Sequence, residues 1–178
     1  MKWFQKQGIP TNLLKDISKD RPDVVMGSRM INKKLALKGG MPFYKFVGNI
    51  ILTKTQNFLL NTKLAEFHTG YRVYKVSSLK RIPFYLNTND FHFDTEILIQ
   101  FFLDKKKVKE ISIPTFYGNE ICHVNGLKYA FNVLKMTLIA KIQKNTPLIF
   151  SQKFVINKAI NKKILKNMEK LLLDASKK

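Results

Sequence analysis

One arginine stands where this chain could hold an anion. Residues 23–27 form a short apolar run that ends in glycine, which predicts a buried strand of a parallel sheet. Ser28 and Arg29 follow directly, at the strand's carboxyl end, where open α/β sheets bind their ligands. A guanidinium can hold a phosphate through two parallel hydrogen bonds. We therefore expect Arg29 to bind an anion, with a structural ion pair as the alternative.

Two carboxylates in one segment are candidates for a general base. Asp94 and Glu96 lie at the start of a predicted helix that ends at Asp104. Either carboxylate could accept a proton from a hydroxyl group held within hydrogen-bonding distance. Acidic residues in a first helical turn also stabilise the helix through its dipole and its free N–H groups. Both interpretations remain open for this pair.

A second group of polar residues lies in a predicted loop that runs into a strand. His68 and Thr69 could contact a phosphate or a sugar, and His68 equally suits a buried, hydrogen-bonded histidine. Gly70 suits a tight turn or a close backbone approach. Arg72 could pair with an acidic residue such as Glu66 or bind phosphate. These alternatives cannot be separated from the sequence.

Other common catalytic patterns are missing from the sequence. It has no His/Cys spacing of a metal site, no serine nucleophile elbow and no GxxxxGK phosphate loop. Gly39 and Gly40 lack the Lys-Ser/Thr pair that such a loop requires. The single cysteine, Cys122, can form no disulfide within the chain.

The candidate residues require a scaffold in which strands and helices alternate, which predicts an α/β fold. Strands are expected over residues 23–27 and 108–114 and at the end of segment 66–74. Helices are expected over residues 43–60, 76–80, 91–104 and 127–142, with a short one capped at Thr11, and loops over residues 30–42 and 117–126.

Charge is the most extreme feature of the composition. The 178 residues include 32 Lys and Arg against 12 Asp and Glu, a formal net charge of +20. Such a field attracts nucleic acid, anionic lipid or phosphate-bearing substrates, and a solvated basic surface explains it equally well. No stretch reaches the ~18 uncharged apolar residues of a membrane span, and residues 1–9 lack the apolar core of a signal peptide.

The composition changes after Pro147, which divides the chain into residues 1–147 and a tail, residues 148–178. The tail is rich in Lys and Asn, and its apolar residues predict a basic amphipathic helix. Such a helix could lie against anionic lipid or be solvated. We expect a cytoplasmic protein, peripheral at the inner face of the membrane.

Five blocks together resemble family 2 glycosyltransferases of the GT-A type, in the group of polyprenyl- and dolichol-phosphate sugar synthases. They occur in that family's order over roughly residues 10–140. The blocks are DVVMGSRM at 23–30, GGMP at 39–42 with Tyr44, Lys45 and Asn49, HTGYR at 68–72, FHFDTEI at 91–97, and EISIP at 110–114 with Tyr117, Gly118 and Glu120.

The resemblance implies an incomplete GT-A (Rossmann-like) sheet with packed helices, and transfer of a sugar from a nucleotide-sugar to a polyprenyl-phosphate or other glycan acceptor. It places Arg29, Lys45 and Asn49 at positions that contact the acceptor phosphate, and residues 117–126 in a mobile loop over the active site. The residues expected to bind substrate are Ser28, Arg29, Lys45, Asn49, His68, Thr69, Gly70, Arg72, Tyr117, Glu120 and His123, and those expected to be catalytic are Asp94 and Glu96.

The sequence departs from the family at the donor site. The family's DxD metal motif precedes the segment that matches residues 9–17, and no DxD occurs there. Mg²⁺ or Mn²⁺ is expected for the complete family domain, without a ligand motif in this chain. The chain could therefore be the product of a truncated gene, a fragment, or one part of a split enzyme whose upstream half another chain supplies. The alternatives are a non-catalytic fragment or subunit and, with no recognised motif to support it, a nucleic-acid-binding module.

Overall fold

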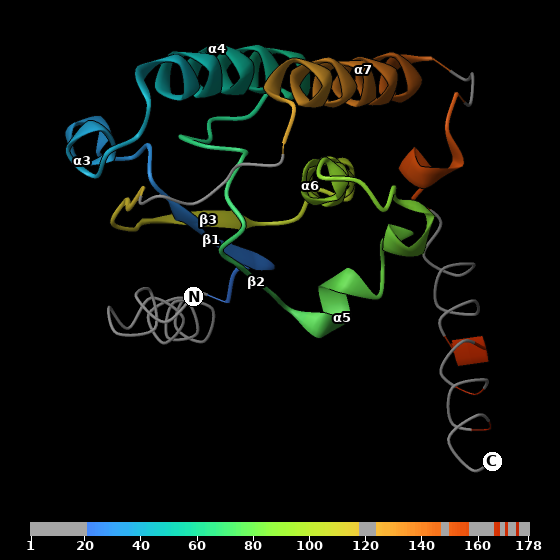
Figure 1. Cartoon of the computed structure of the whole chain (residues 1–178). Coiled ribbons are helices and arrows are strands. Elements are labelled where there is room, and N and C mark those ends of the chain that lie inside the picture. The colour runs from blue at the N-terminus through green and yellow to red at the C-terminus, as the bar shows by residue number, and fades with distance from the viewer. Residues whose placement is uncertain are drawn as a thin grey trace.

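The computed structural model describes residues 21–117, 124–146 and 150–156, together with residues 166, 167, 170 and 174. Within these ranges, three strands form one mixed sheet in the order β2–β1–β3. The central strand β1 is parallel to β3 and antiparallel to β2, and helices pack on the sheet (Figure 1). The strands are β1 (Val24–Ser28), β2 (Arg72–Tyr74) and β3 (Val108–Ser112). The predicted α/β fold is confirmed.

Strand β1 is central because it can be buried on both faces. Its five residues are all buried, as the continuous apolar run predicts. Gly27 leaves room for the neighbouring chain, since a Cβ atom there would lie 2.7 Å from Ile113 Cγ2. Strand β1 therefore places Arg29 at a defined point, immediately beyond the carboxyl edge of the sheet.

Two long helices form a layer over the sheet (Figure 1). They are α4 (Phe43–Leu60) and α7 (Gly126–Asn145), whose predicted positions are confirmed. A buried hydrogen bond from Gln56 Nε2 to Thr137 Oγ1, 3.3 Å long, joins them. Apolar residues at helical spacing explain why both segments form helices.

The helix α6 (Phe93–Leu103) supplies much of the core. Its residues 95–101 are all buried, so it is covered on nearly every side. The main cluster combines residues of β1, α6 and the connecting segments, namely Val24, Met26, Phe67, Ile82, Ile97, Leu98 and Phe101.

The prediction of a continuous loop over residues 30–42 was wrong. Helix α3 (Lys33–Lys38) occupies its middle, with Asn32 Oδ1 accepting a hydrogen bond from Leu35 N at 3.3 Å. Ala36 is fully buried. Six residues make fewer than two turns, too few for a helical period to show in the sequence. The remaining short helices are α5 (Val76–Leu79), η1 (Phe84–Leu86) and η2 (Gln152–Phe154).

The described start of the tail is a short 3-10 turn, η2, where the sequence predicted an α-helix. Phe154 is buried against Ile99 and Ala140, so packing on α6 and α7 determines the local shape. Most later tail residues, and the helix predicted at Thr11, lie outside the described residues. Within the described part of the chain, no helix is long and apolar enough to cross a membrane.

Candidate active site

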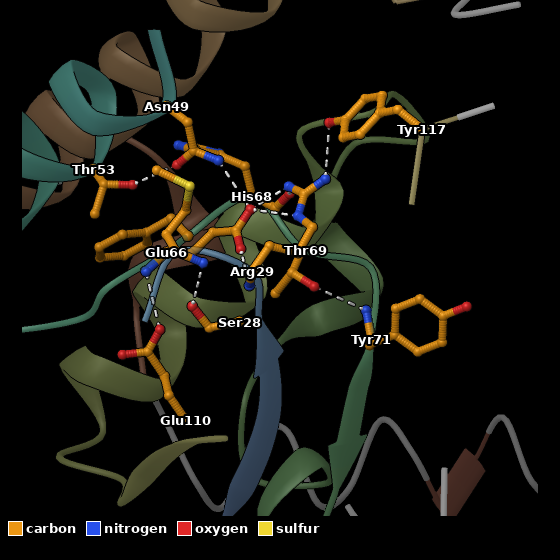
Figure 2. Close-up of polar contacts among 12 residues, drawn as sticks. Ser28, Arg29, Asn49, Thr53, Glu66, His68, Thr69, Tyr71, Glu110 and Tyr117 are labelled. Atoms are coloured by element: carbon orange, nitrogen blue, oxygen red, sulfur yellow. Dashed lines mark hydrogen bonds and ion pairs between the residues drawn. The ribbon is translucent and has the colours of Figure 1, made fainter. Parts of the chain in front are cut away.

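Arg29 is held in place by a network of polar contacts (Figure 2). Its Nε donates to Glu66 Oε1 at 3.0 Å, and its Nη2 forms an ion pair with the same oxygen. Its backbone N donates to Glu66 Oε2 at 2.7 Å. Nη2 also donates to the carbonyl of His68 at 2.9 Å, and Nη1 donates to Tyr117 Oη at 3.1 Å. Of the five guanidinium N–H donors, one on Nη1 has no partner among the described residues.

Glu66 is the buried anion that orients Arg29. Its side chain is fully buried, and Asn49 Nδ2 donates to its Oε1 at 2.9 Å. Thr53 Oγ1 donates to Asn49 Oδ1 at 3.1 Å and so fixes the orientation of that amide (Figure 2). Burial lowers the pKa of Arg29, but the hydrogen bond and charge of Glu66 outweigh burial, and the pKa rises. Arg29 therefore keeps its positive charge beside Glu66.

Glu110 of β3 supports the backbone around Glu66. One carboxylate oxygen accepts a hydrogen bond from Glu66 N at 2.9 Å (Figure 2). The other accepts from Ala65 N at 2.7 Å. Burial raises the pKa of Glu110, and the negative charge of Glu66 adds to that effect. Hydrogen bonds from the two backbone N–H groups act in the opposite direction. Glu110 thus positions the segment that carries the partner of Arg29.

Arg72 is a structural residue in this network. Its Nε and Nη2 donate to the carbonyls of Thr69 and Phe67 at 2.8 and 2.7 Å, and its Nη1 donates to the carbonyl of Asp94. The Asp94 carboxylate lies 3.9 Å from Nη1. Its partner is therefore Asp94, and the Glu66 partner that the sequence suggested belongs to Arg29. With its side chain 3% exposed, Arg72 joins the 67–69 segment to the start of α6.

His68 is half-buried beside a tyrosine that the sequence did not indicate. Its Nδ1 lies 2.9 Å from Tyr129 Oη, and its buried Nε2 has no hydrogen-bond partner among the described residues. Burial lowers the pKa of His68 to about 3, with further contributions from the charges of Arg72 and Arg29. His68 is therefore neutral at pH 7. Tyr129 belongs to α7, 61 residues away, so no local pattern could have linked the two.

These side chains line a cavity of about 750 Å³ between α4, α7, the end of β1 and the loop after Glu66. Nine residues that the sequence singled out line it. They are Arg29, Lys45, Asn49, His68, Thr69, Gly70, Arg72, Asp94 and Tyr117. The structure thus brings together, around one cavity, residues from each of the five sequence blocks.

The cavity is lined by both cationic and apolar side chains. The ammonium group of Lys45 lies 5.5 Å from the centroid of the Tyr117 ring, and the Tyr117 hydroxyl accepts a hydrogen bond from Arg29. The apolar lining includes residues that the sequence did not single out as site residues. These are Met41, Leu52, Phe91, Leu127 and Ala130, with Tyr44 and Tyr129 beside them.

Two of the predicted site residues in the described ranges, Ser28 and Glu96, do not line the cavity. Ser28 is fully buried below Arg29, with its Oγ accepting from Met30 N at 3.3 Å. Glu96 is fully buried and accepts from Thr88 N at 2.8 Å and from Lys153 Nζ at 2.7 Å. Its oxygens are directed to these partners and not to the cavity. Glu120 and His123 lie outside the described residues.

The described side chains do not provide a metal site. No group of three His, Cys, Asp or Glu side chains in the described ranges could hold a metal ion. Asp94 is the one carboxylate among the cavity-lining residues, while the nearby Glu66 is neutralised by Arg29. These residues therefore do not fit the Mg²⁺ or Mn²⁺ that the family resemblance implies for a complete domain.

Comparison of this chain with protein-family models, with curated proteins and with solved structures found no match. The function of the site must therefore be argued from its own residues and geometry.

Proposed function

We propose that this chain is the acceptor-side part of a GT-A-type family 2 glycosyltransferase, which moves a sugar from a nucleotide-sugar to a polyprenyl phosphate or another glycan acceptor. The observation that carries the proposal is the shared cavity. Arg29, Lys45 and Asp94 come from three separate sequence blocks and line one space. That space adjoins the carboxyl end of β1, where α/β sheets bind ligands.

The cationic lining residues Arg29 and Lys45 suit an acceptor phosphate. Arg29 keeps one N–H donor for a ligand, and its contacts with Glu66 hold that donor in position before a ligand arrives. Lys45 supplies a second, more adjustable cation. A phosphate oxygen is already anionic, so it needs positioning by cations more than activation by a base. Fixed donors of this kind suit that task.

Asp94 is the candidate base for an acceptor that presents a hydroxyl group. Its side chain is 44% exposed and lines the cavity, and Arg72 lies close enough to stabilise the carboxylate. Glu96 takes no part in the proposed reaction. Its contacts with Lys153 and Thr88 assign it to holding α6 against the neighbouring segments.

The apolar lining residues of the cavity favour a lipid-linked acceptor. Tyr44, Phe91 and Leu127 line the cavity and are also exposed, so its opening has an apolar rim. A phosphate at Arg29 and Lys45 could then extend a hydrocarbon chain along that rim. Burial of apolar surface contributes roughly 25 cal/mol per Å² to such binding.

None of the described residues is assigned to binding of the donor. A second candidate, a non-catalytic subunit that binds the acceptor, is favoured by this lack of a metal-binding group among the described side chains. The two candidates share the acceptor site and differ in whether sugar is transferred.

The first experiment measures binding of a short-chain, water-soluble polyprenyl phosphate to the chain by titration calorimetry. We expect saturable binding that Lys45→Ala weakens about tenfold or more, the effect of losing a charge-assisted hydrogen bond. The matched control is Lys75→Ala, at an exposed lysine outside the cavity. No binding, or equal weakening by both variants, would contradict the acceptor site.

The second experiment separates the two candidates. Sugar transfer to the same acceptor is measured with a panel of nucleoside-diphosphate sugars and Mn²⁺, with the chain alone and with a donor-binding domain added in trans. Transfer that Lys45→Ala reduces supports the glycosyltransferase. Acceptor binding without transfer in either mixture identifies the non-catalytic subunit.

A further inference from the structure

The two long helices expose stripes of large apolar side chains. On α4, Tyr44, Ile51 and Phe58 recur at intervals of seven residues, which is two helical turns, and Phe58 is 84% exposed. Single exposed apolar residues are normal on a soluble protein, but a contiguous patch indicates an interaction surface. The stripe on α7 consists of Leu127, Phe131, Leu138 and Ile142, with Leu127 86% exposed.

The stripes lie on the outer side of the helical layer. The opposite sides of the helices hold their buried residues, including Gln56 of α4 and Thr137 of α7, which bond to each other. Both helices cover the same side of the molecule (Figure 1). Tyr44 and Leu127 also line the cavity that contains Arg29, so each stripe reaches the rim of that cavity. We call this surface, made by the exposed residues of α4 and α7, the outer face.

The outer face is purely basic in its charged residues. Helices α4 and α7 contain 18 and 20 residues, and neither has an Asp or Glu. Their lysines are Lys45, Lys54, Lys128, Lys135, Lys141 and Lys144, of which Lys54, Lys128, Lys135 and Lys144 are exposed. Lysines beside an apolar stripe are the pattern of a helix that lies in the interface of an anionic membrane.

We propose that the outer face docks on the surface of an anionic lipid bilayer. The aromatic and aliphatic side chains enter the boundary between head groups and acyl chains, while the lysines contact lipid phosphates. Docking in this orientation places the apolar rim of the cavity at the bilayer surface. The proposal goes beyond sugar transfer and does not depend on it, and it assigns docking to α4 and α7 and not to the C-terminal tail.

The test is co-sedimentation of the full chain with vesicles of phosphatidylcholine, with or without phosphatidylglycerol. We expect binding to the vesicles that contain phosphatidylglycerol, little binding to phosphatidylcholine alone, and weaker binding as salt screens the lysines. No donor or acceptor is added. A negative result here is therefore distinct from a negative result in the polyprenyl phosphate titration.

Apolar substitutions locate the docking surface. The quadruple variant Ile51→Ser, Phe58→Ser, Phe131→Ser and Leu138→Ser removes exposed side chains that do not line the cavity. We expect it to lose at least about tenfold in vesicle affinity, because each large side chain contributes over 1 kcal/mol when buried in an apolar phase. The control, Val76→Ser with Leu86→Ser, removes exposed apolar residues outside α4 and α7 and should bind as the parent does.

Charge reversals test whether vesicle binding depends on the lysines of the outer face or on the net charge of the whole chain. Lys135→Glu on the outer face and Lys107→Glu beside β3 each lower the formal net charge from +20 to +18. We expect about a fivefold or greater loss of affinity for Lys135→Glu, since each lysine near an anionic surface contributes about 1 kcal/mol. Lys107→Glu should change it little. Thermal unfolding of every variant checks that the exposed substitutions leave the fold intact.

Three outcomes would overturn the proposal. Parent-like vesicle binding by the quadruple variant would place docking elsewhere, the basic tail included. Equal binding to neutral vesicles would remove the role of the lysines. Self-association of the chain that the quadruple variant abolishes, without vesicle binding by the parent, would identify the outer face as a contact between copies.

Discussion

At the scale of single residues, the site depends on an ion pair in which the fully buried Glu66 holds the partly buried Arg29. Arg29 and Glu66 are 37 residues apart, and each also bonds to a further residue of the site, Tyr117 or Asn49. A buried pair adds little net stability compared with apolar residues, but breaking it leaves an unpaired charge. The pair therefore serves to fix the direction of the guanidinium.

The first residue-scale prediction concerns Glu66→Gln. We expect it to lower the free energy of unfolding by about 3 kcal/mol, because Arg29 then stays charged without its anion. Urea unfolding at pH 7 measures the loss. Asp90→Asn, at a carboxylate that is 44% exposed, is the control, and we expect a change within about 0.5 kcal/mol. Equal stability of the two variants would contradict a buried, ionised pair.

The second residue-scale prediction concerns pH. The pKa of His68 is about 3 in the folded chain and about 6.5 when unfolded. Between these values the unfolded state binds one more proton, so the free energy of unfolding falls as pH falls. From pH 6.5 to pH 5, this histidine should account for a loss of about 2 kcal/mol.

His68→Gln is the variant that isolates this effect. Glutamine can still bond to Tyr129 but does not titrate. Unfolding in guanidinium chloride at several pH values should show a shallower decline than the parent between pH 6.5 and pH 5. If the free energy of unfolding fell equally steeply with pH in the variant and the parent, His68 would have an ordinary pKa in the folded chain.

At the scale of elements, a glycine pair joins the α3–α4 connection to the segment that follows β3. A Cβ atom at Gly39 would lie 2.2 Å from the carbonyl oxygen of Thr115, and Gly40 has φ +82°. Tyr117 N donates to Gly39 O at 2.9 Å. The close approach places Tyr117 over Arg29 and Lys45, so these glycines act as positioning residues for the cavity.

Gly39→Ala should therefore destabilise the chain by about 1–3 kcal/mol, the usual cost of forcing atoms into a filled space. Acceptor affinity should fall as well, because Tyr117 is displaced. The matched control is Gly48→Ala in α4, where a Cβ atom meets nothing within 4 Å. That change should stabilise the helix by about 0.5–1 kcal/mol. Relative to the parent, the unfolding temperature should fall for Gly39→Ala and rise for Gly48→Ala. Changes of the same sign in the two variants would contradict the prediction.

At the scale of the whole molecule, the segment after α7 returns to α6 and closes the core. Lys153 Nζ bonds to Glu96 Oε1 at 2.7 Å, and Gln100 Nε2 donates to the carbonyl of Lys153 at 2.8 Å. Phe154 is buried between α6 and α7. Residues 150–156 therefore belong to the same packed core as α6 and α7.

Phe154→Ala should lower the free energy of unfolding by about 3–5 kcal/mol, through lost apolar burial and the cavity left behind. Phe150→Ala, at a phenylalanine that is 54% exposed, should change it by less than about 0.5 kcal/mol. Chemical unfolding of both variants measures the difference. Similar values would show that the segment packs loosely against the core.

The sequence by itself determined the elements whose patterns are long or strongly apolar. Strand β1 and helix α4 follow from a continuous apolar run and from helical spacing, and both were predicted within a residue of their bounds. Arg29 was also found from its position after this strand, whereas Lys45 was singled out only by the family resemblance. Local patterns carry this information because strand and helix periods repeat over short distances.

Only the tertiary structure decided how these residues are partnered. Asp94 and Glu96 are two positions apart in a helix, about 200° around its axis, so they face different sides. Packing placed Asp94 at the cavity and Glu96 in the core. It also paired Glu66 with Arg29 and brought Tyr129 to His68. These contacts join residues dozens of positions apart, and such distances leave no periodic signal in the sequence.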